Sequence, residues 1–471
     1  MRVVFINPWS QDEEKVKWTP DYQTHYWRNA YFGLVQIATY TRSLGHDVVI
    51  IDAERDLLME AKGKPKLLLK QIKQKVTDLH PDVVGVSGMS WRYPVSSKIL
   101  DELTPLSREI GFKLIQGGHH ATAYPESCIN DHPRLDCVFK GFAEVGVKQY
   151  LEATTKDNID GIVYKNGNNF LHTLDCYTKD LDSLPMPYWD LLDTAFYTYP
   201  SVWVHRSMTT PVRNLDTIAS RGCPFRCKFC TGSPGKPTWH SVDYIIEYIR
   251  YIKSKYNINS TIFQDSSLGS NHRFLKELCE KLITSNVSKG LIWTANMRAD
   301  QVTVEIAQLM YQAGCRMVFV GFESGSDRVL EAMDKRTTSK DNAKCALALE
   351  VAGMPYWASF IAGYPGETEE ELKETIRFAQ SIHPLAGWAN QFYPSPGSRV
   401  FGELIGEGRL SIPKNPKGWA AISRIGQKGD VKNGRWAAMS KGTFKKLVRQ
   451  FQILMIEVTN KGVQRELEFP S

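Results

Sequence analysis

The sequence predicts an α/β protein with a doubly wound parallel sheet at the N-terminus, followed by a partial (β/α)6 barrel and a small C-terminal segment. Short β-branched runs alternate with helical periodicities through most of the chain, which is the pattern of parallel sheets. These runs end in Gly, Pro or small-residue turns, where ligands bind in such sheets. With 471 residues, of which 42% are hydrophobic and 23% charged, the chain is long enough for two or three domains.

The expected N-terminal domain covers residues 1–155. Between its first two strands, Leu34, Ile37, Ala38 and Thr41 recur at helical spacing. Its predicted strands are residues 3–7, 46–52, 82–88, 113–116 and 137–139.

A hairpin and linker are expected over residues 156–205, because runs at 161–164 and 169–172 flank an Asn-Gly turn. The barrel is expected over 206–396, and a basic, partly helical region over 397–471, with a helix near 443–459. Six strands are predicted for the barrel: 216–220, 261–264, 291–295, 316–321, 355–362 and 387–392. An active site would lie at their carboxyl ends.

Three of the nine cysteines, Cys223, Cys227 and Cys230, lie within eight residues. Three thiolates at this spacing can bind three irons of a 4Fe–4S cubane and leave the fourth iron open to a further ligand. Structural zinc is the alternative, but it needs four ligands, and His240 is the nearest candidate for the fourth.

At these cysteines the chain resembles the radical S-adenosylmethionine (SAM) superfamily, over about residues 216–396. The resemblance implies that SAM chelates the open iron and is cleaved reductively to a 5′-deoxyadenosyl radical. It also implies SAM contacts at the aromatic residue before the last cysteine and at later strand ends. These are Phe229, Asp265, Ser266, Arg298, Glu323, Ser324 and Gly363. The sequence identifies no catalytic residue beyond them.

The N-terminal sheet is similar to the cobalamin-binding, Rossmann-like domains that precede many radical SAM barrels, at residues 33–52, 81–87, 117–125 and 141–144. Small turn residues would allow close approach of the corrin or its tail. The Asp-x-His-x-x-Gly signature that supplies an axial histidine is absent. Cobalamin is therefore expected to bind without that ligand, although a sheet that binds nothing is the alternative. The expected contacts are Asn7, Ser87, Gly88, Gly117, Gly118, His119 and Gly141.

Together these resemblances imply a cobalamin-dependent radical SAM methyltransferase that acts at an unactivated carbon of a small molecule or natural product. One SAM molecule would supply the methyl group and another the radical. The alternatives are a radical SAM dehydratase, epimerase or cyclase without functional cobalamin, and a non-catalytic zinc- or nucleotide-binding module. An external electron donor of flavodoxin or ferredoxin type is also implied.

Residues 411–450 contain ten Lys or Arg and one acid, Asp430. Such a stretch is either a solvated surface or attracts an anionic substrate, and the sequence leaves both open. No recognisable nucleic-acid motif accompanies the charge, so nucleic acid is not an expected partner. No run reaches the ~20 apolar residues of a membrane span. Residues 1–8 read as a buried strand rather than a signal peptide, so the cytoplasm is the expected compartment.

Overall fold

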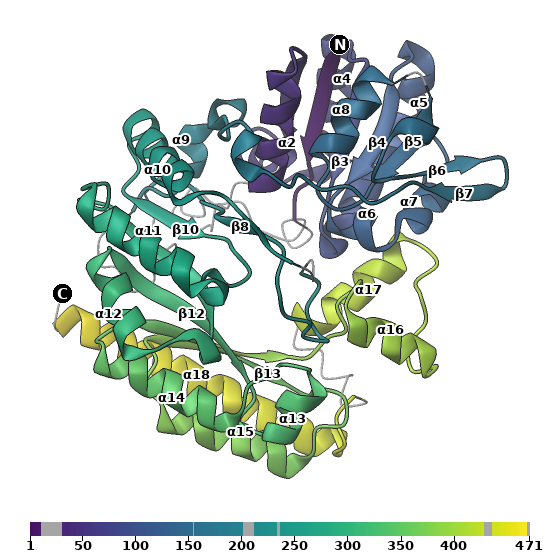
Figure 1. Cartoon of the computed structure of the whole chain (residues 1–471). Coiled ribbons are helices and arrows are strands. Elements are labelled where there is room, and N and C mark those ends of the chain that lie inside the picture. The colour runs from purple at the N-terminus through teal and green to yellow at the C-terminus, as the bar shows by residue number, and fades with distance from the viewer. Residues whose placement is uncertain (11–30, 154, 201–211, 233–235, 428–435, 469–471) are drawn as a thin grey trace. The chain divides into compact units, whose positions relative to one another are not determined.

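The computed structural model describes residues 1–10, 31–153, 155–200, 212–232, 236–427 and 436–468 (Figure 1). These form two compact units that interleave in sequence. The first comprises the described residues of 1–24, 29–196 and 395–424, and the second those of 197–394 and 425–471. Among the described residues, no helix combines the length and apolar character needed to cross a membrane.

The first unit is built on a seven-stranded sheet with the order β2-β1-β3-β4-β5-β6-β7. Its first five strands pair in parallel, and the order reverses beside β1, as in doubly wound folds. The strands are β1 (Arg2–Asn7), β2 (Asp47–Asp52), β3 (Val83–Ser87), β4 (Lys113–Gly117), β5 (Leu135–Phe139), β6 (Ile162–Asn166) and β7 (Asn169–His172).

Both faces of this sheet are buried, because alternate residues of each strand belong to different cores. Val4 and Ile6 of β1 pack on one face with α4 and α5, whereas Val3 and Phe5 pack on the other with α2 and α8. This explains the continuous apolar runs in the sequence. The helices are α2 (Phe32–Ser43), α3 (Ala53–Met59), α4 (Pro65–Leu79), α5 (Tyr93–Ile110), α6 (His119–Ala123), α7 (Pro125–Asp131), α8 (Glu144–Glu152) and α9 (Thr194–Tyr197).

The hairpin β6–β7 is part of this sheet and not of a separate connecting region. β6 pairs antiparallel with β5, and Ile162 and Val163 are fully buried there. An antiparallel strand can cover the free edge of a parallel sheet without a crossover helix, which is why the hairpin adds directly to β5.

The expected C-terminal region is divided between the two units. α16 (Arg399–Gly406) and most of α17 (Pro416–Gln427) belong to the first unit, where Phe401 and Trp419 enter the core below α4 and α5. α18 (Lys441–Glu468) belongs to the second unit. Burial of two large aromatic side chains provides the physical reason for this division.

The second unit contains a five-stranded sheet with the order β10-β11-β12-β13-β14, and all neighbours are parallel. Its strands are β10 (Ser260–Phe263), β11 (Ile292–Arg298), β12 (Cys315–Glu323), β13 (Tyr356–Ala362) and β14 (Ala386–Gln391). The helices between them are α10 (Val242–Tyr256), α11 (His272–Thr284), α12 (Val304–Gln312), α13 (Asp327–Ala332), α14 (Ser339–Val351) and α15 (Glu369–Ser381).

The strand predicted at 216–220 is reduced to isolated parallel bridges with β10, made by Asn214 and Thr217. The Thr217 amide donates to the Ile262 carbonyl at 2.9 Å, so the chain still occupies the sixth position. It then turns into β8 (Ser220–Arg221), which pairs antiparallel with β9 (Thr238–Trp239). This turn shortens the strand and leads directly into the cysteine loop.

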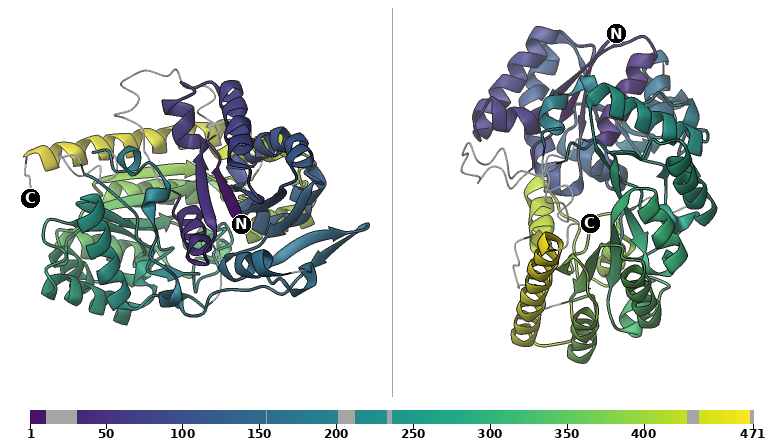
Figure 2. Two further views of the ribbon diagram at one scale, coloured as in Figure 1. Left: turned by 90° about the horizontal axis from the view of Figure 1, so that it is seen from above. Right: turned by 90° about the vertical axis from the view of Figure 1, so that its left-hand side faces the viewer.

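α18 covers the last strand of this sheet (Figures 1 and 2). The Gly387 amide of β14 donates to the Thr459 hydroxyl at 3.3 Å, and the Gln452 amide group donates to the Ala389 carbonyl at 3.5 Å. A helix along an edge strand satisfies backbone groups that would otherwise pair with other chains. The predicted C-terminal helix is therefore present and extends further in both directions than residues 443–459.

Candidate active site

The loop after β8 brings the three cysteines of the motif together. Backbone hydrogen bonds fix it: the Lys228 amide donates to the Met333 carbonyl at 2.8 Å, and the Cys230 amide to the Cys227 carbonyl at 3.1 Å. Burial raises the pKa values of the Cys227 and Cys230 thiols, and negative charge on Cys227 and Cys223 raises that of Cys230 further. The three sulfurs are thus close enough for the charge on one to act on another.

This donor set fits an iron–sulfur cubane better than zinc. No three His, Cys, Asp or Glu side chains in the described ranges converge on one point where a single metal ion would sit. Each thiolate of a cubane binds a different iron, so its sulfurs need not converge in this way. The His240 ring instead stacks on Tyr244, with centroids 4.0 Å apart.

Arg298, at the end of β11, lies against this loop. Its Nη1 donates to the Cys227 sulfur at 3.5 Å, and its guanidinium lies 3.7 Å from the centroid of the Phe225 ring. Its other nitrogens donate to the Asp300 carboxylate and to the Lys335 carbonyl. The positive charge of Arg298 therefore lowers the pKa of Cys227 against the effect of burial.

Glu323 is the last residue of β12, and its carboxylate forms a 3.0 Å ion pair with Lys335 in which both side chains are almost fully buried. Glu323 has a φ of +64°, which is rare for a residue with a side chain. The Lys335 ammonium also lies 5.9 Å from the centroid of the Phe229 ring. The structure thus brings together Phe229, Arg298 and Glu323 of the predicted site, and adds Lys335.

Asp265, beyond the end of β10, binds the segment that leads into the cysteine loop. It accepts from the Ala219 amide at 3.0 Å and from the Ser220 hydroxyl at 2.5 Å. Burial raises its pKa to about 6. Ser266 is exposed, and a Cβ on Gly232 would lie 3.3 Å from the Cys230 sulfur and 3.8 Å from the Ser266 hydroxyl. Asp265 therefore positions the loop, and Ser266 lies beside Cys230.

The structure places Ser324 away from these groups. It is fully buried, and its hydroxyl lies 2.9 Å from that of Thr375 on α15. Gly363, at the end of β13, has a φ of +87°, and a Cβ there would lie 2.6 Å from the Phe444 ring of α18. Its amide donates to the buried Glu367 carboxyl at 2.5 Å, and burial raises the pKa of Glu367 to about 8.

In the first unit, the predicted cobalamin contacts lie at or just beyond the carboxyl ends of β1, β3, β4 and β5. Gly88 and Gly118 are glycines because two loops meet there: a Cβ on Gly118 would lie 2.7 Å from the Gly88 carbonyl oxygen. A Cβ on Gly141, in contrast, would meet nothing within 4 Å. The other predicted residues at this edge are Asn7, which is buried, Ser87 and Gly117, which are half-buried, and His119, which is exposed.

Buried polar atoms near this edge test whether a corrin fits. Asn7 Oδ1, Gln116 Oε1 and His120 Nε2 are buried without a hydrogen-bond partner among the described residues. A buried polar atom without a partner is costly, and the amide side chains of cobalamin carry donors and acceptors that could supply one. The residues present are therefore compatible with this cofactor.

His120 itself is enclosed by aromatic rings that sequence analysis did not identify. It stacks on Tyr93 at 3.8 Å and meets Trp419 edge-on at 4.7 Å. Burial lowers its pKa to about 3, so the ring is neutral at physiological pH. Because Trp419 is 299 residues away in sequence, no local pattern indicates this contact.

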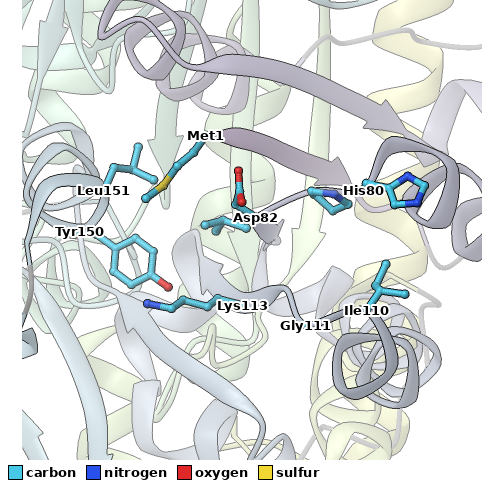
Figure 3. Close-up of a pocket in the computed structure, with 10 residues that line it drawn as sticks. Met1, His80, Asp82, Ile110, Gly111, Lys113, Tyr150 and Leu151 are labelled. Atoms are coloured by element: carbon cyan, nitrogen blue, oxygen red, sulfur yellow. The ribbon is translucent and has the colours of Figure 1, made fainter.

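A cavity of about 390 Å³ lies at the opposite edge of the same sheet, near the amino ends of its strands (Figure 3). Asp82, Val83 and Lys113 line it together with Met1 and Tyr150. The Lys113 ammonium lies 5.6 Å from the centroid of the Tyr150 ring. Ligands of doubly wound sheets bind at the carboxyl ends of the strands, so we assign no role to this cavity.

The described cations of the basic stretch are divided between the two units. Lys414 and Lys417 are exposed at the start of α17, whereas Lys441 and Arg449 are exposed on α18. Lys445 and Lys446 are exposed, whereas Phe444, Leu447 and Val448 are buried. Residues 428–435 of the stretch lie outside the described residues. Attraction of an anionic substrate by these lysines stays a prediction.

Comparison with known proteins matches each of the two units to a different family model. Residues 217–379 match the radical SAM superfamily model, and residues 30–151 match the B12 binding domain model. An uncharacterized methyltransferase of Pyrococcus horikoshii is 28% identical over 391 residues, which cover 80% of this chain and 79% of that protein. An anaerobic magnesium-protoporphyrin IX monomethyl ester cyclase of Rubrivivax gelatinosus is 25% identical, over 86% and 70% of the two chains.

The fold is also that of a solved structure. The radical SAM methyltransferase TsrM of Kitasatospora setae, solved with cobalamin and a [4Fe-4S] cluster, has a TM-score of 0.66 with this chain at 15% sequence identity. The match covers 86% of this chain and 75% of the other.

Proposed function

This chain belongs to the radical SAM superfamily and carries a B12-binding domain, and we propose that it is a cobalamin-dependent methyltransferase that acts at an unactivated carbon of a small molecule. One observation carries the proposal, namely that a single chain contains both sites. The second unit has the three-cysteine loop, and the sheet of the first unit has buried polar atoms at its carboxyl edge with no partner among the described residues. The relative from Pyrococcus horikoshii, itself named a methyltransferase, supports the same reading.

Cys223, Cys227 and Cys230 would hold the 4Fe–4S cluster and leave one iron open for SAM. When bound, the cluster supplies the electron that cleaves SAM, and the corrin carries the methyl group. Arg298 places a positive charge at the Cys227 sulfur. The Glu323 carboxylate, which is held by Lys335, would bind the SAM amine or ribose. The Phe229 ring would lie near the adenine. The carboxyl edge of the first sheet, with Asn7 and Gly141, would hold the cobalamin.

The electron would come from an external donor of flavodoxin or ferredoxin type, and the substrate would be a small molecule. A radical cyclase is the second candidate, because the relative from Rubrivivax gelatinosus is named as one. Both candidates need the cluster and SAM, so retention of corrin and methyl transfer distinguish them.

The experiment uses anaerobically reconstituted protein, hydroxocobalamin, SAM with a deuterated methyl group and an excess of a low-potential chemical reductant. The reductant converts the cobalamin to cob(I)alamin, which SAM can methylate, and supplies the electron for SAM cleavage. We expect about one corrin per chain after desalting, with no histidine coordination in its spectrum. We also expect the deuterated methyl group on the extracted corrin by mass spectrometry. If the protein cleaves SAM but retains no corrin, methyl transfer through cobalamin is contradicted. A cyclase or another radical reaction without cobalamin is then the function that fits.

A further inference from the structure

Arg298, the last residue of β11, uses nearly all of its hydrogen-bond donors within the protein. Its Nε donates to the Asp300 carboxylate at 3.0 Å, and its Nη2 donates to that carboxylate at 3.3 Å and to the Lys335 carbonyl at 2.5 Å. Its Nη1 donates to the Cys227 sulfur at 3.5 Å. A guanidinium has five N–H groups, so only one, on Nη1, has no hydrogen-bond partner among the described residues.

This arrangement does not suit the SAM contact that the family resemblance implies for Arg298. An arginine that recognises a carboxylate uses two parallel N–H groups. The Asp300 carboxylate already takes the pair formed by Nε and Nη2 of Arg298. The Arg298 side chain is also only 6% exposed. A SAM carboxylate would therefore find a single N–H and a cation that is already paired.

The guanidinium is instead fixed against the cysteine loop. The centroid of the Phe225 ring, two residues before Cys227, lies 3.7 Å from the guanidinium carbon of Arg298. Burial and contact with an aromatic face remove water from a cation, and its electrostatic interactions with nearby groups become stronger as a result. The Cys227 sulfur therefore accepts a hydrogen bond from a cation that water screens little.

A short loop after α13, residues 333–336, holds both Arg298 and the cysteine loop. Its Lys335 carbonyl accepts from Arg298, and its first carbonyl accepts from a backbone amide of the cysteine loop at 2.8 Å. Asp334 and Arg336, on either side of Lys335, have φ values of +49° and +58°. Such conformations are costly for residues with side chains, and they persist where the surroundings impose them, often at functional sites. This strained loop thus fixes the guanidinium at Cys227.

A cation at a cluster ligand changes the reduction potential of the cluster. Reduction adds one negative charge, so a nearby positive charge stabilises the reduced form more than the oxidised form. Hydrogen bonds to the sulfurs and net charge are among the factors that set the potentials of iron–sulfur clusters. Cys227 would be a thiolate in the loaded protein, and a guanidinium N–H that donates to a thiolate makes a charge-assisted hydrogen bond.

We propose that Arg298 raises the reduction potential of the 4Fe–4S cluster through its hydrogen bond to the Cys227 thiolate, and that it does not bind SAM. The inference rests on the cluster of the proposed function and not on its corrin. A higher potential makes transfer of the single electron from the external donor to the cluster more favourable. Arg298 is thus a positioning residue that acts through Cys227.

The test is a redox titration of the anaerobically reconstituted full chain without SAM, with a low-potential chemical reductant and mediators. Electron paramagnetic resonance measures the reduced cluster. We expect the midpoint potential of Arg298→Gln to fall by at least about 59 mV, which is a tenfold lower ratio of reduced to oxidised cluster at a fixed potential. The Kd for SAM, measured by calorimetry, should change less than about tenfold, because loss of a hydrogen bond to a charged group would change it more.

Arg316→Gln is the matched control. The Arg316 guanidinium also donates to backbone carbonyls, those of Tyr311 and Cys315, and lies 4.4 Å from the centroid of the Tyr311 ring. It belongs to the amino end of β12, whereas Arg298 and the cysteine loop lie at the carboxyl ends of the strands. The midpoint potential of Arg316→Gln should therefore equal that of wild type.

Asp300→Asn tests the same charge in the opposite direction. It removes the negative partner of Arg298 and leaves the guanidinium in place, so the midpoint potential should rise. This variant decides the question if Arg298→Gln holds fewer than about four irons per chain. A midpoint potential that does not change in Asp300→Asn would then contradict the inference.

The other outcomes separate the two halves of the proposal and the function on which it rests. Unchanged potential with at least tenfold weaker SAM binding in Arg298→Gln would overturn the inference and assign Arg298 to SAM. A lower potential together with such weaker binding would support the first half and overturn the second. Unchanged potential in protein that retains corrin would overturn this inference alone. A lower potential in protein that retains no corrin would support it and contradict methyl transfer through cobalamin.

Discussion

The Lys335 ammonium and the Glu323 carboxylate form a 3.0 Å ion pair in which both side chains are almost fully buried. The pair connects three parts of the site. Glu323 ends β12, the positive charge of Lys335 lowers the pKa of Cys227, and the Lys335 carbonyl accepts from Arg298 at 2.5 Å. A buried pair of this kind is costly to break, because removal of either partner leaves the other as a buried charge without a counter-ion.

Replacing Lys335 with Met should therefore destabilise the protein by about 3–5 kcal/mol. Adding Glu323→Gln in the same chain should recover most of this loss, because no uncompensated charge remains. Urea denaturation monitored by circular dichroism measures both variants. Lys373→Met is the control: its pairs with Glu369 and Glu370 are exposed, and surface pairs contribute about 0–1 kcal/mol. Equal losses for Lys335→Met and Lys373→Met would contradict the prediction.

Gly321 should not tolerate even one added carbon. A Cβ there would lie 2.3 Å from a Glu323 carboxylate oxygen and 3.2 Å from the Lys335 nitrogen, both held in the buried pair. We expect Gly321→Ala to cost about 1–3 kcal/mol and to weaken SAM binding, measured by calorimetry, because Glu323 must move. Gly402→Ala in α16, where a Cβ would meet nothing within 4 Å, should be neutral or slightly stabilising. Unchanged SAM binding in Gly321→Ala would separate Glu323 from the SAM site.

The strands were predictable because most of them are buried on both faces. A run of apolar residues predicts such a strand even when the neighbouring strands are unknown. Each predicted strand of the first sheet overlaps an observed one. The cysteine loop was predictable because its ligands are close in sequence. The local sequence pattern predicts a strand but not the strand with which it pairs. The hairpin at 161–172 was therefore predicted, but its pairing with β5 was not.

Other features depend on contacts that are distant in sequence or on irregular backbone. Glu323 and Ser324 are adjacent, but the register of β12 with β13 shifts between Gly321 and Glu323. The strand therefore turns Glu323 towards Lys335, while Ser324 joins Thr375. Lys335 lies between Asp334 and Arg336, which both have positive φ, so no periodic pattern marks it. Burial of Trp419 in the first unit depends on packing alone.

The cluster cysteines should be individually essential. Replacing Cys223, Cys227 or Cys230 with Ala removes one of three iron ligands, so we expect less than about four irons per chain and no reductive cleavage of SAM to 5′-deoxyadenosine. Iron analysis and chromatography of the products measure this. Cys279→Ala and Cys345→Ala are controls, because both side chains are fully buried among apolar neighbours. Cleavage retained in all three motif variants would contradict a three-cysteine cluster.

Asp216 should make the stability of the protein fall as the pH rises. It is buried beside β10, and within the described ranges its carboxyl accepts only from the side-chain amides of Asn214 and Gln264, each at 3.0 Å. Burial raises its pKa to about 7, compared with about 3.9 for an unfolded chain. Between these values the folded chain keeps a proton that the unfolded chain has released. The stabilisation is complete below about pH 4 and is lost as the pH rises through 7.

Asp216→Asn stays uncharged and should lack this dependence. Relative to wild type, its free energy of unfolding should rise between pH 4 and 8, by up to about 1.4 kcal/mol for each unit of pKa difference. Urea denaturation at half-unit pH steps measures the difference. Glu371→Gln is a control of opposite sign. Hydrogen bonds, chiefly from Arg328, lower the pKa of Glu371 to about 2. Glu371→Gln should therefore lower the free energy of unfolding most above pH 4.5, and by less as the pH falls towards 2. A stability difference for Asp216→Asn that does not change with pH would show that Asp216 ionises in the folded protein as it does in the unfolded one.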